Sequence, residues 1–298
     1  MSKRLSDTSF FAAYMLVFMC SLSVMTLRTS VAADNSIRIR IYIAQQVALL
    51  IGFIIPSLSK KIWDFLMRRA AGIAMISCYA FCVVTVHFTD DILILCLLNI
   101  ICSLCVGMLG AMVYESIAAG TDFNNIEGRR HIGISVGIGG MAAMVLQWLI
   151  QTLAGIEGFL IVLLTAACVY VIISLYKREH DIHYRKRSGK DRLYPAYGVS
   201  RRCVCLIVAI CCMLAMLAYY EAHMNRLVFA DYFYNWPRIF AAAGYLMTGL
   251  MYGRKKRGIV SMVMLCVSLI AVVINYLMLG SNEGRWIHIS LFYLVLGS

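Results

Sequence analysis

The stretch KREHDIHYRKRSGKDRLYPAYGVSRR, at residues 177–202, is the one long polar segment of this sequence. It contains nine Lys or Arg residues and three acidic residues. Six apolar segments of membrane-spanning length precede it, and three more and a fragment follow it. The pattern predicts two sets of helices that are connected by a basic loop.

The composition of the chain agrees with this pattern. Hydrophobic residues make up 62% of the 298 residues and charged residues only 14%, whereas about a quarter of the residues of a soluble domain are charged. So many apolar segments are typical of an all-α, polytopic transmembrane bundle. The net charge of +12 lies in short blocks between apolar segments. Such blocks are typical of cytoplasmic loops and argue against nucleic acid as a partner of this chain.

The expected organisation has three parts. Residues 1–176 form a half of six helices, residues 177–202 a basic cytoplasmic loop, and residues 203–298 a second half of three to four helices. The predicted spans are residues 9–27, 41–58, 70–87, 92–114, 131–153, 159–176, 203–220, 239–252 (extended back to 236), 258–279 and the fragment 286–298. A cleaved signal peptide is the alternative for the first span. The fragment corresponds to about 20 Å of helix where a bilayer core needs about 30 Å, so we expect the second half to be incomplete.

The distribution of basic residues predicts the orientation. With the N-terminus inside, 21 of the 27 Lys and Arg residues fall on the cytoplasmic side. Because positive charge is retained on that side, we expect a multi-pass protein of the cell membrane with a cytoplasmic N-terminus. The basic loop is expected to attract anionic lipid.

Two short motifs suggest duplication and a family. The sequence RRAAGI at residues 68–73 and KRGI at residues 256–259 each open a predicted span. Their glycines, Gly72 and Gly258, are 186 residues apart, about the length of one of the two predicted halves. The sequence GLMYGRKKR at residues 249–257 resembles the cytoplasmic signature G-x-x-x-D-R-x-G-R-R of the major facilitator superfamily, and it retains Gly249, Arg254 and Arg257. The resemblance implies a transporter that moves a small solute by alternating access, and further spans beyond residue 298.

Polar side chains within the apolar segments are the candidates for a solute site, because they normally face the interior of a bundle. Six amides lie mostly towards the outer halves of the predicted spans: Gln45, Gln46, Asn99, Gln147, Gln151 and Asn275. Ser21, Ser23 and Thr26 are expected at the same depth on the first span. Converging, they would form an uncharged substrate-binding vestibule. The alternative is that each amide only binds a neighbouring helix, at about 0.6 kcal/mol each.

Four glycines in the fifth predicted span, Gly133, Gly137, Gly139 and Gly140, remove side chains from its surface. They predict the close approach of another helix. A half-bundle that moves would also need such a smooth face.

No catalytic or cofactor-binding motif is recognisable. The sequence shows no nucleotide-binding loop, zinc-ligand spacing, catalytic triad or cluster of His and Asp on any span, so we expect neither an enzyme nor a metal or other cofactor. Most of the 12 cysteines lie within apolar segments, where Cys behaves as a small apolar side chain. Two functions remain: a transporter with the bilayer and a small solute as partners, or the membrane sensor module of a bacterial helix-turn-helix transcriptional regulator.

Overall fold

A computed structural model describes residues 2–32, 34–58, 60–66, 68–119, 126–154, 166–175 and 239–251, and the single positions 177, 270, 273, 277 and 294. Every regular element within these residues is helical, so the all-α prediction is confirmed. The basic loop at 177–202 and the predicted spans at 203–220, 258–279 and 286–298 lie outside the described residues, apart from those single positions.

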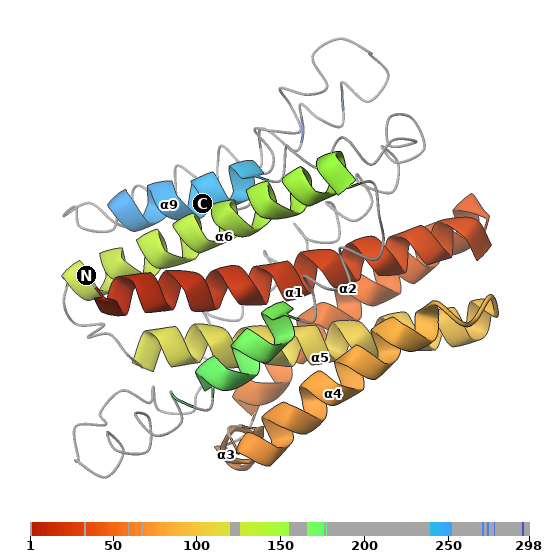
Figure 1. Ribbon diagram of the computed structural model, residues 1–298, viewed down its shortest axis with the longest axis horizontal. Helices are drawn as coiled ribbons and strands as arrows, with labels where there is room; N and C mark the ends of the chain where they lie inside the picture. Colours follow the sequence, from red (N-terminus) through yellow and green to blue (C-terminus); the bar gives the residue numbers. More distant parts are fainter. Residues whose placement is uncertain are drawn as a thin grey trace. The chain divides into compact units, whose positions relative to one another are not determined.

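The helices from α1 to α6 follow one another with short connections (Figure 1). The described helices are α1 (Ser2–Ala32), α2 (Asn35–Leu58), α3 (Lys60–Leu66), α4 (Arg69–Val86), α5 (Ile92–Ala119), α6 (Ile126–Ala154) and α9 (Ile239–Met251), with a further helix over Ala166–Leu175.

Several helices continue beyond the apolar segments that predicted them. The expected loop at residues 60–69 contains α3, and the expected polar connection between the fourth and fifth spans is shorter because α5 continues to Ala119 and α6 begins at Ile126. Lys, Arg and Glu are good helix formers, so a change to polar sequence does not end a helix by itself.

Side chains in the connections cap the N-termini of two of the helices. Asp34 accepts hydrogen bonds from the Ile37 backbone N–H at 2.9 Å and the Ser36 hydroxyl at 3.0 Å. Asp91 accepts from the backbone N–H groups of Leu93 at 2.8 Å and Ile94 at 3.2 Å. Both carboxylates satisfy backbone donors that have no partner within the first helical turn.

One stretch of the described chain is long and apolar enough to cross a membrane by length and composition, and it is Ile92–Tyr114 within α5. It coincides with the fourth predicted span. Its 23 residues correspond to about 35 Å of helix. The other apolar helical stretches are shorter: Leu5–Met19, Arg40–Pro56, Ala70–Val86, Arg130–Leu146 and Ala166–Leu175.

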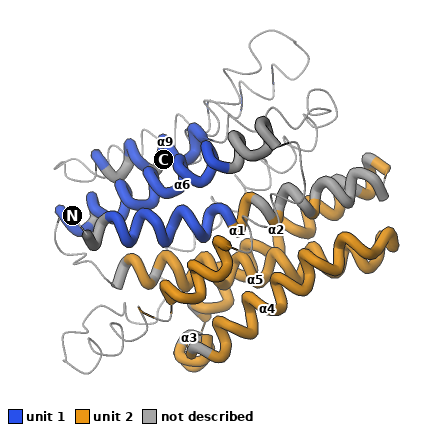
Figure 2. The backbone as a smooth tube through the Cα atoms, in the orientation of Figure 1, with its two compact units in different colours: residues 1–16, 120–156, 232–298 blue, residues 17–119, 157–231 orange. Residues whose placement is uncertain are grey.

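The chain divides into two compact units (Figure 2). Unit 1 comprises residues 1–16, 120–156 and 232–298, and unit 2 comprises residues 17–119 and 157–231. Each unit therefore combines sequence from both sides of the basic loop. The helix α1 contributes residues to both units.

In unit 2, α2 and α5 cross in close contact through two glycines. A Cβ added at Gly52 would lie 2.5 Å from the Leu104 carbonyl oxygen and 3.0 Å from the Gly107 Cα. A Cβ added at Gly107 would overlap the Leu49 carbonyl oxygen. The two backbones pack directly on each other, and α4 packs on α5 beside them. The Tyr79 hydroxyl on α4 donates a hydrogen bond of 2.9 Å to the Val17 carbonyl of α1.

In unit 1, the glycines of α6 receive α9 and the first turns of α1. A Cβ at Gly137 would lie 2.6 Å from Leu246 N, Cα and Cβ, and one at Gly139 would lie 2.7 Å from the Thr8 carbonyl oxygen. A Cβ at Gly140 would lie 3.1 Å from Ala242 Cβ. The predicted close approach is therefore confirmed at these three glycines.

Candidate functional site

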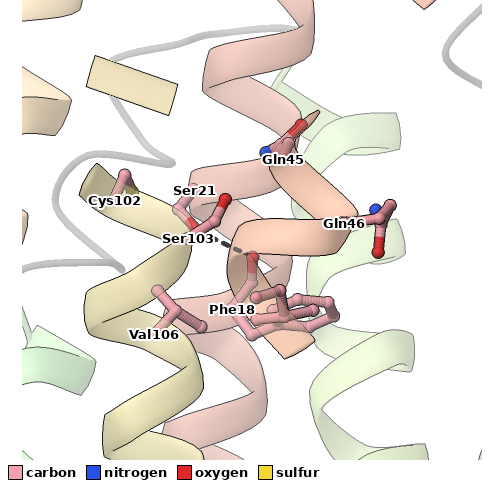
Figure 3. Close-up of a pocket in the computed structure, with 8 residues that line it drawn as sticks. Phe18, Ser21, Gln45, Gln46, Cys102, Ser103 and Val106 are labelled. Carbon is pink, nitrogen blue, oxygen red and sulfur yellow. Dashed lines mark hydrogen bonds between the residues drawn. The ribbon is translucent and has the colours of Figure 1, made fainter. Parts of the chain in front are cut away.

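A polar hollow lies within unit 2, between α1, α2 and α5 (Figure 3). Its lining residues are Phe18, Ser21, Gln45, Gln46, Leu49, Cys102, Ser103 and Val106. We call this set the polar hollow. It contains two of the amides that were predicted as site residues, Gln45 and Gln46, and one hydroxyl that was expected at the same depth, that of Ser21.

Helical spacing brings these side chains together. Phe18 and Ser21 are three residues apart on α1, Gln45 and Leu49 are four apart on α2, and the α5 residues recur over one turn. Positions three and four apart lie on the same helix face. The close crossing at Gly52 and Gly107 holds the α2 and α5 faces together, so the hollow is a consequence of how these two helices pack.

Most of the polar groups of the hollow are buried. Gln45 is 7% exposed, and Ser21 and Ser103 are buried as well. The Ser21 hydroxyl donates a hydrogen bond of 2.8 Å to the Phe18 carbonyl oxygen of its own helix, the dashed line in Figure 3. In the same view the Gln46 amide points away from Cys102 and Val106, on the other side of α2.

The described lining residues carry amide, hydroxyl and thiol groups but no carboxylate, imidazole, amine or guanidinium. Amides and hydroxyls both donate and accept hydrogen bonds. The hollow can therefore bind water or a neutral polar group through these residues. Its narrow interior has room for about one water-sized group.

Asn99 does not belong to this lining. Its side chain is buried at 1% exposure, and its Nδ2 donates a hydrogen bond of 2.8 Å to the Leu95 carbonyl oxygen one turn earlier on α5. This bond within one helix satisfies a buried donor. It fits neither the predicted vestibule nor a bridge between helices.

The other predicted site residues are placed only in part. Gln147 and Gln151 lie on α6, in unit 1, and their side-chain positions are outside what the structure describes. Gly249 lies in α9. Asn275, Arg254 and Arg257 fall outside the described residues.

The sequence analysis missed an ionisable pair in unit 1 that consists of a buried Asp and a partly buried His. His131 Nε2 of α6 lies 2.7 Å from Asp7 Oδ2 of α1, and the two side chains are 13% and 1% exposed. The two residues are 124 positions apart, and each stands at the polar end of a predicted apolar segment, where an ionisable residue is expected at the surface. The one available signal was that Asp7 and His131 stand at the starts of the first and fifth predicted spans, which both begin on the cytoplasmic side in the expected topology.

No metal centre is present among the residues described: no group of three or more His, Cys, Asp or Glu side chains there could hold a metal ion. The six cysteines whose side chains the structure describes are free thiols, and four of them, including Cys102 and Cys105, are buried. They pack as small apolar side chains.

Comparison with known proteins gives no relative: no family model, curated protein or solved structure matches this chain.

Proposed function

We propose that this chain is a polytopic helical membrane protein, similar to the major facilitator superfamily, that transports a small uncharged polar solute by alternating access. The single observation that carries the proposal is the polar hollow in unit 2, whose described helices also expose large apolar side chains.

The outer surface of unit 2 supports a lipid environment. On α5, large apolar side chains are exposed along one face: Leu93, Ile94, Leu97 and Ile101. On α4, Phe81 and Val84 are exposed in the same way. Large contiguous apolar patches are rare on soluble monomers, and polar groups such as Gln45 and Ser103 are buried here. This inside-out distribution suits a protein whose solvent is hydrocarbon.

The lining of the hollow indicates the class of solute. Gln45 and Ser103 offer hydrogen-bond donors and acceptors without charge. A neutral molecule with hydroxyl or amide groups would exchange its hydrogen bonds to water for hydrogen bonds to these side chains. The present hollow holds only about one water-sized group, so a solute requires the helices to separate, as alternating access provides.

The contact between α6 and α9 supports such movement. These helices belong to the two halves that the sequence predicts, one on each side of the basic loop, and they meet within unit 1. Gly137 and Gly140 give α6 a smooth surface at this contact. A smooth surface lets one helix shift along another without interlocked side chains.

The function can be tested with purified protein and a panel of neutral polyols, sugars and small amides. A solute that binds raises the midpoint of thermal unfolding by mass action, and it should then be taken up by vesicles containing the protein. We expect Gln45→Leu and Ser103→Ala each to weaken binding by about 2- to 10-fold, the value of one hydrogen bond. Ser77→Ala, on an exposed position of α4, is the matched control and should change nothing.

The results separate the proposed functions. Binding and uptake that both depend on Gln45 support the transporter. Binding without uptake would instead favour the membrane sensor module. Uptake that is unaffected by Gln45→Leu and Ser103→Ala would exclude the polar hollow as the solute site.

The proposed topology has a separate test. Ser188→Cys, in the basic loop and in a background without other reactive thiols, should not react with a membrane-impermeant maleimide in intact cells. Labelling from outside would contradict a cytoplasmic N-terminus. A vesicle series with increasing anionic lipid tests the lipid contact of the same loop, because binding there should weaken with salt.

A further inference from the structure

Cysteines gather in unit 2 where α4 packs on α5, two helices that lie side by side (Figure 1). Cys78 and Cys82 are on α4, and Cys102 and Cys105 are on α5. The Cys78 thiol lies within hydrogen-bonding range of the thiols of both Cys82 and Cys105. Two helices therefore bring thiols into contact that are distant in the sequence.

The register of the two helices places Cys78 opposite Cys105. A Cβ added at Gly72, near the start of α4, would lie 3.9 Å from Met112 Cε, towards the end of α5, so the helices run antiparallel. Cys78 comes six residues after Gly72, and Cys105 comes seven residues before Met112. At 1.5 Å per residue, the two cysteines lie at levels that differ by about 1.5 Å along the helices.

Disulfide geometry selects Cys105 as the partner of Cys78. A disulfide requires two Cβ atoms about 3.5–4.5 Å apart. Residues four apart on one helix have Cβ atoms about 5–6 Å apart, so a bond between Cys78 and Cys82 would distort α4. Cys105 is on the facing helix and is free of that restriction.

The two thiols differ in their exposure. Cys78 is exposed on the surface of α4, whereas Cys105 is buried. An accessible cysteine beside a second thiol is the arrangement in which a sulfenic acid forms and is then converted to a disulfide. Phe81, three residues after Cys78, is 68% exposed, so the surface beside the accessible thiol favours an oxidant with an apolar body.

We propose that Cys78 is an oxidation site for apolar hydroperoxides, such as those of lipid chains, and that Cys105 converts the product into a disulfide between α4 and α5. In the first step the Cys78 sulfur attacks the peroxide, an S–O bond forms, the O–O bond breaks and an alcohol leaves. In the second step the Cys105 sulfur attacks the sulfenic acid, the S–S bond forms and water leaves. The two thiols lose two electrons and two protons, which the hydroperoxide accepts.

This modification goes beyond the transport proposal and does not depend on any solute. Val106, next to Cys105, lines the polar hollow, so the disulfide would fasten a wall of the hollow to α4. A thiol reductant would release it by exchange.

The disulfide can be detected in the full chain. The protein in detergent is treated with cumene hydroperoxide, its remaining thiols are blocked with N-ethylmaleimide, and it is cut with an endoproteinase that cleaves before aspartate. Asp90 and Asp91 are exposed in the connection between α4 and α5, so this cut separates the two helices. We expect mass spectrometry to find their peptides joined through Cys78 and Cys105, and to find them separate after treatment with dithiothreitol.

Substitutions identify the thiols responsible. Cys78→Ser changes an exposed position and should abolish the joined peptides. Cys82→Ser, one turn further along α4, is the matched control and should retain them. The absence of joined peptides in the unsubstituted protein, a link through other cysteines, or a link that survives Cys78→Ser would overturn the proposal.

A second measurement tests which thiol reacts first. In Cys105→Ala the sulfenic acid at Cys78 has no partner, so dimedone should label Cys78 several-fold more than in the unsubstituted protein. Labelling that is unchanged by Cys105→Ala would reject Cys105 as the second thiol. Cumene hydroperoxide should also form the disulfide faster than hydrogen peroxide does, when each rate is divided by that oxidant's rate with free cysteine. Equal ratios would reject the preference for an apolar oxidant.

Discussion

The α2–α5 contact in unit 2 and the α6–α9 contact in unit 1 both depend on glycine, but in different ways. Gly52 and Gly107 face each other, and each would drive a Cβ into the carbonyl oxygen of the opposite helix. Gly137 and Gly140 instead lie against residues that carry side chains: Gly137 against the backbone and Cβ of Leu246, and Gly140 against the Cβ of Ala242. In the first contact both helices lack a side chain at the crossing, whereas in the second only α6 does. We therefore expect the first contact to resist adjustment more than the second.

The largest effect is expected where two backbones meet. Gly107→Ala places a methyl group against the Leu49 carbonyl oxygen, and neither α2 nor α5 can retreat without opening the polar hollow. We expect a loss of about 3 kcal/mol or more in the free energy of unfolding. Thermal unfolding and the yield of monodisperse protein in detergent would measure it.

Gly72→Ala is the matched control for that substitution. Its added Cβ would meet only the end of the Met112 side chain, at 3.9 Å, which is an ordinary contact. Its unfolding midpoint should remain close to that of the unsubstituted protein. Equal losses for the two substitutions would refute the assignment of the α2–α5 crossing as a direct backbone contact.

A smaller effect is expected at Gly137→Ala. The new methyl group would meet the backbone and Cβ of Leu246 at 2.6 Å, but α9 is a helix of 13 residues that can shift as a body. We expect a loss of about 2 kcal/mol, measured by the same unfolding experiment. A loss larger than that of Gly107→Ala would reverse the proposed difference between the two contacts.

Gly140→Ala tests the α6–α9 contact further, because the methyl group that it adds would meet a side-chain atom and not the backbone of α9. Its Cβ would lie 3.1 Å from Ala242 Cβ, so we expect a loss of about 1 kcal/mol. Ala242→Gly removes that atom and should restore most of the loss in the double variant, as a double-mutant cycle would measure. Additive losses would place the strain elsewhere.

The smallest effect concerns a carboxylate in the opposite environment to Asp7. Asp34 is exposed, and its hydrogen bonds from the Ile37 backbone and the Ser36 hydroxyl lower its pKa. A lowered pKa in the folded state stabilises the protein above the ordinary aspartate pKa of about 3.9, and that stabilisation is lost as the pH falls through the lowered value. Asp34→Asn should therefore differ slightly from the unsubstituted protein near neutral pH and converge with it in acid. A difference that grows in acid would contradict the sign.

Much of the helical architecture was predictable, and the reason is local. Runs of apolar residues indicated α2, α4, α5 and α9 because an apolar helix reveals itself in consecutive positions. The ends of the helices were less accessible, as α3 and the extension of α5 to Ala119 show, because polar residues in the connections also favour helix.

The candidate site was predictable only in part. Gln45, Gln46 and Ser21 stood out as polar residues at one depth in apolar segments, and the structure brings them together. Asn99 stood out for the same reason, yet it bonds to its own helix. Polarity and depth do not specify the direction of a side chain, which depends on the face that its helix turns toward a neighbour.

The sequence by itself determined that this protein is helical and apolar, because a helix is made of hydrogen bonds four residues apart and of side chains in a local period. The tertiary structure alone decided which helix faces meet, and so placed Gly52 against Gly107 and Asp7 against His131. Such pairings depend on how closely two backbones approach and on contacts between ionisable groups that lie more than a hundred residues apart in the sequence. No local pattern encodes either one.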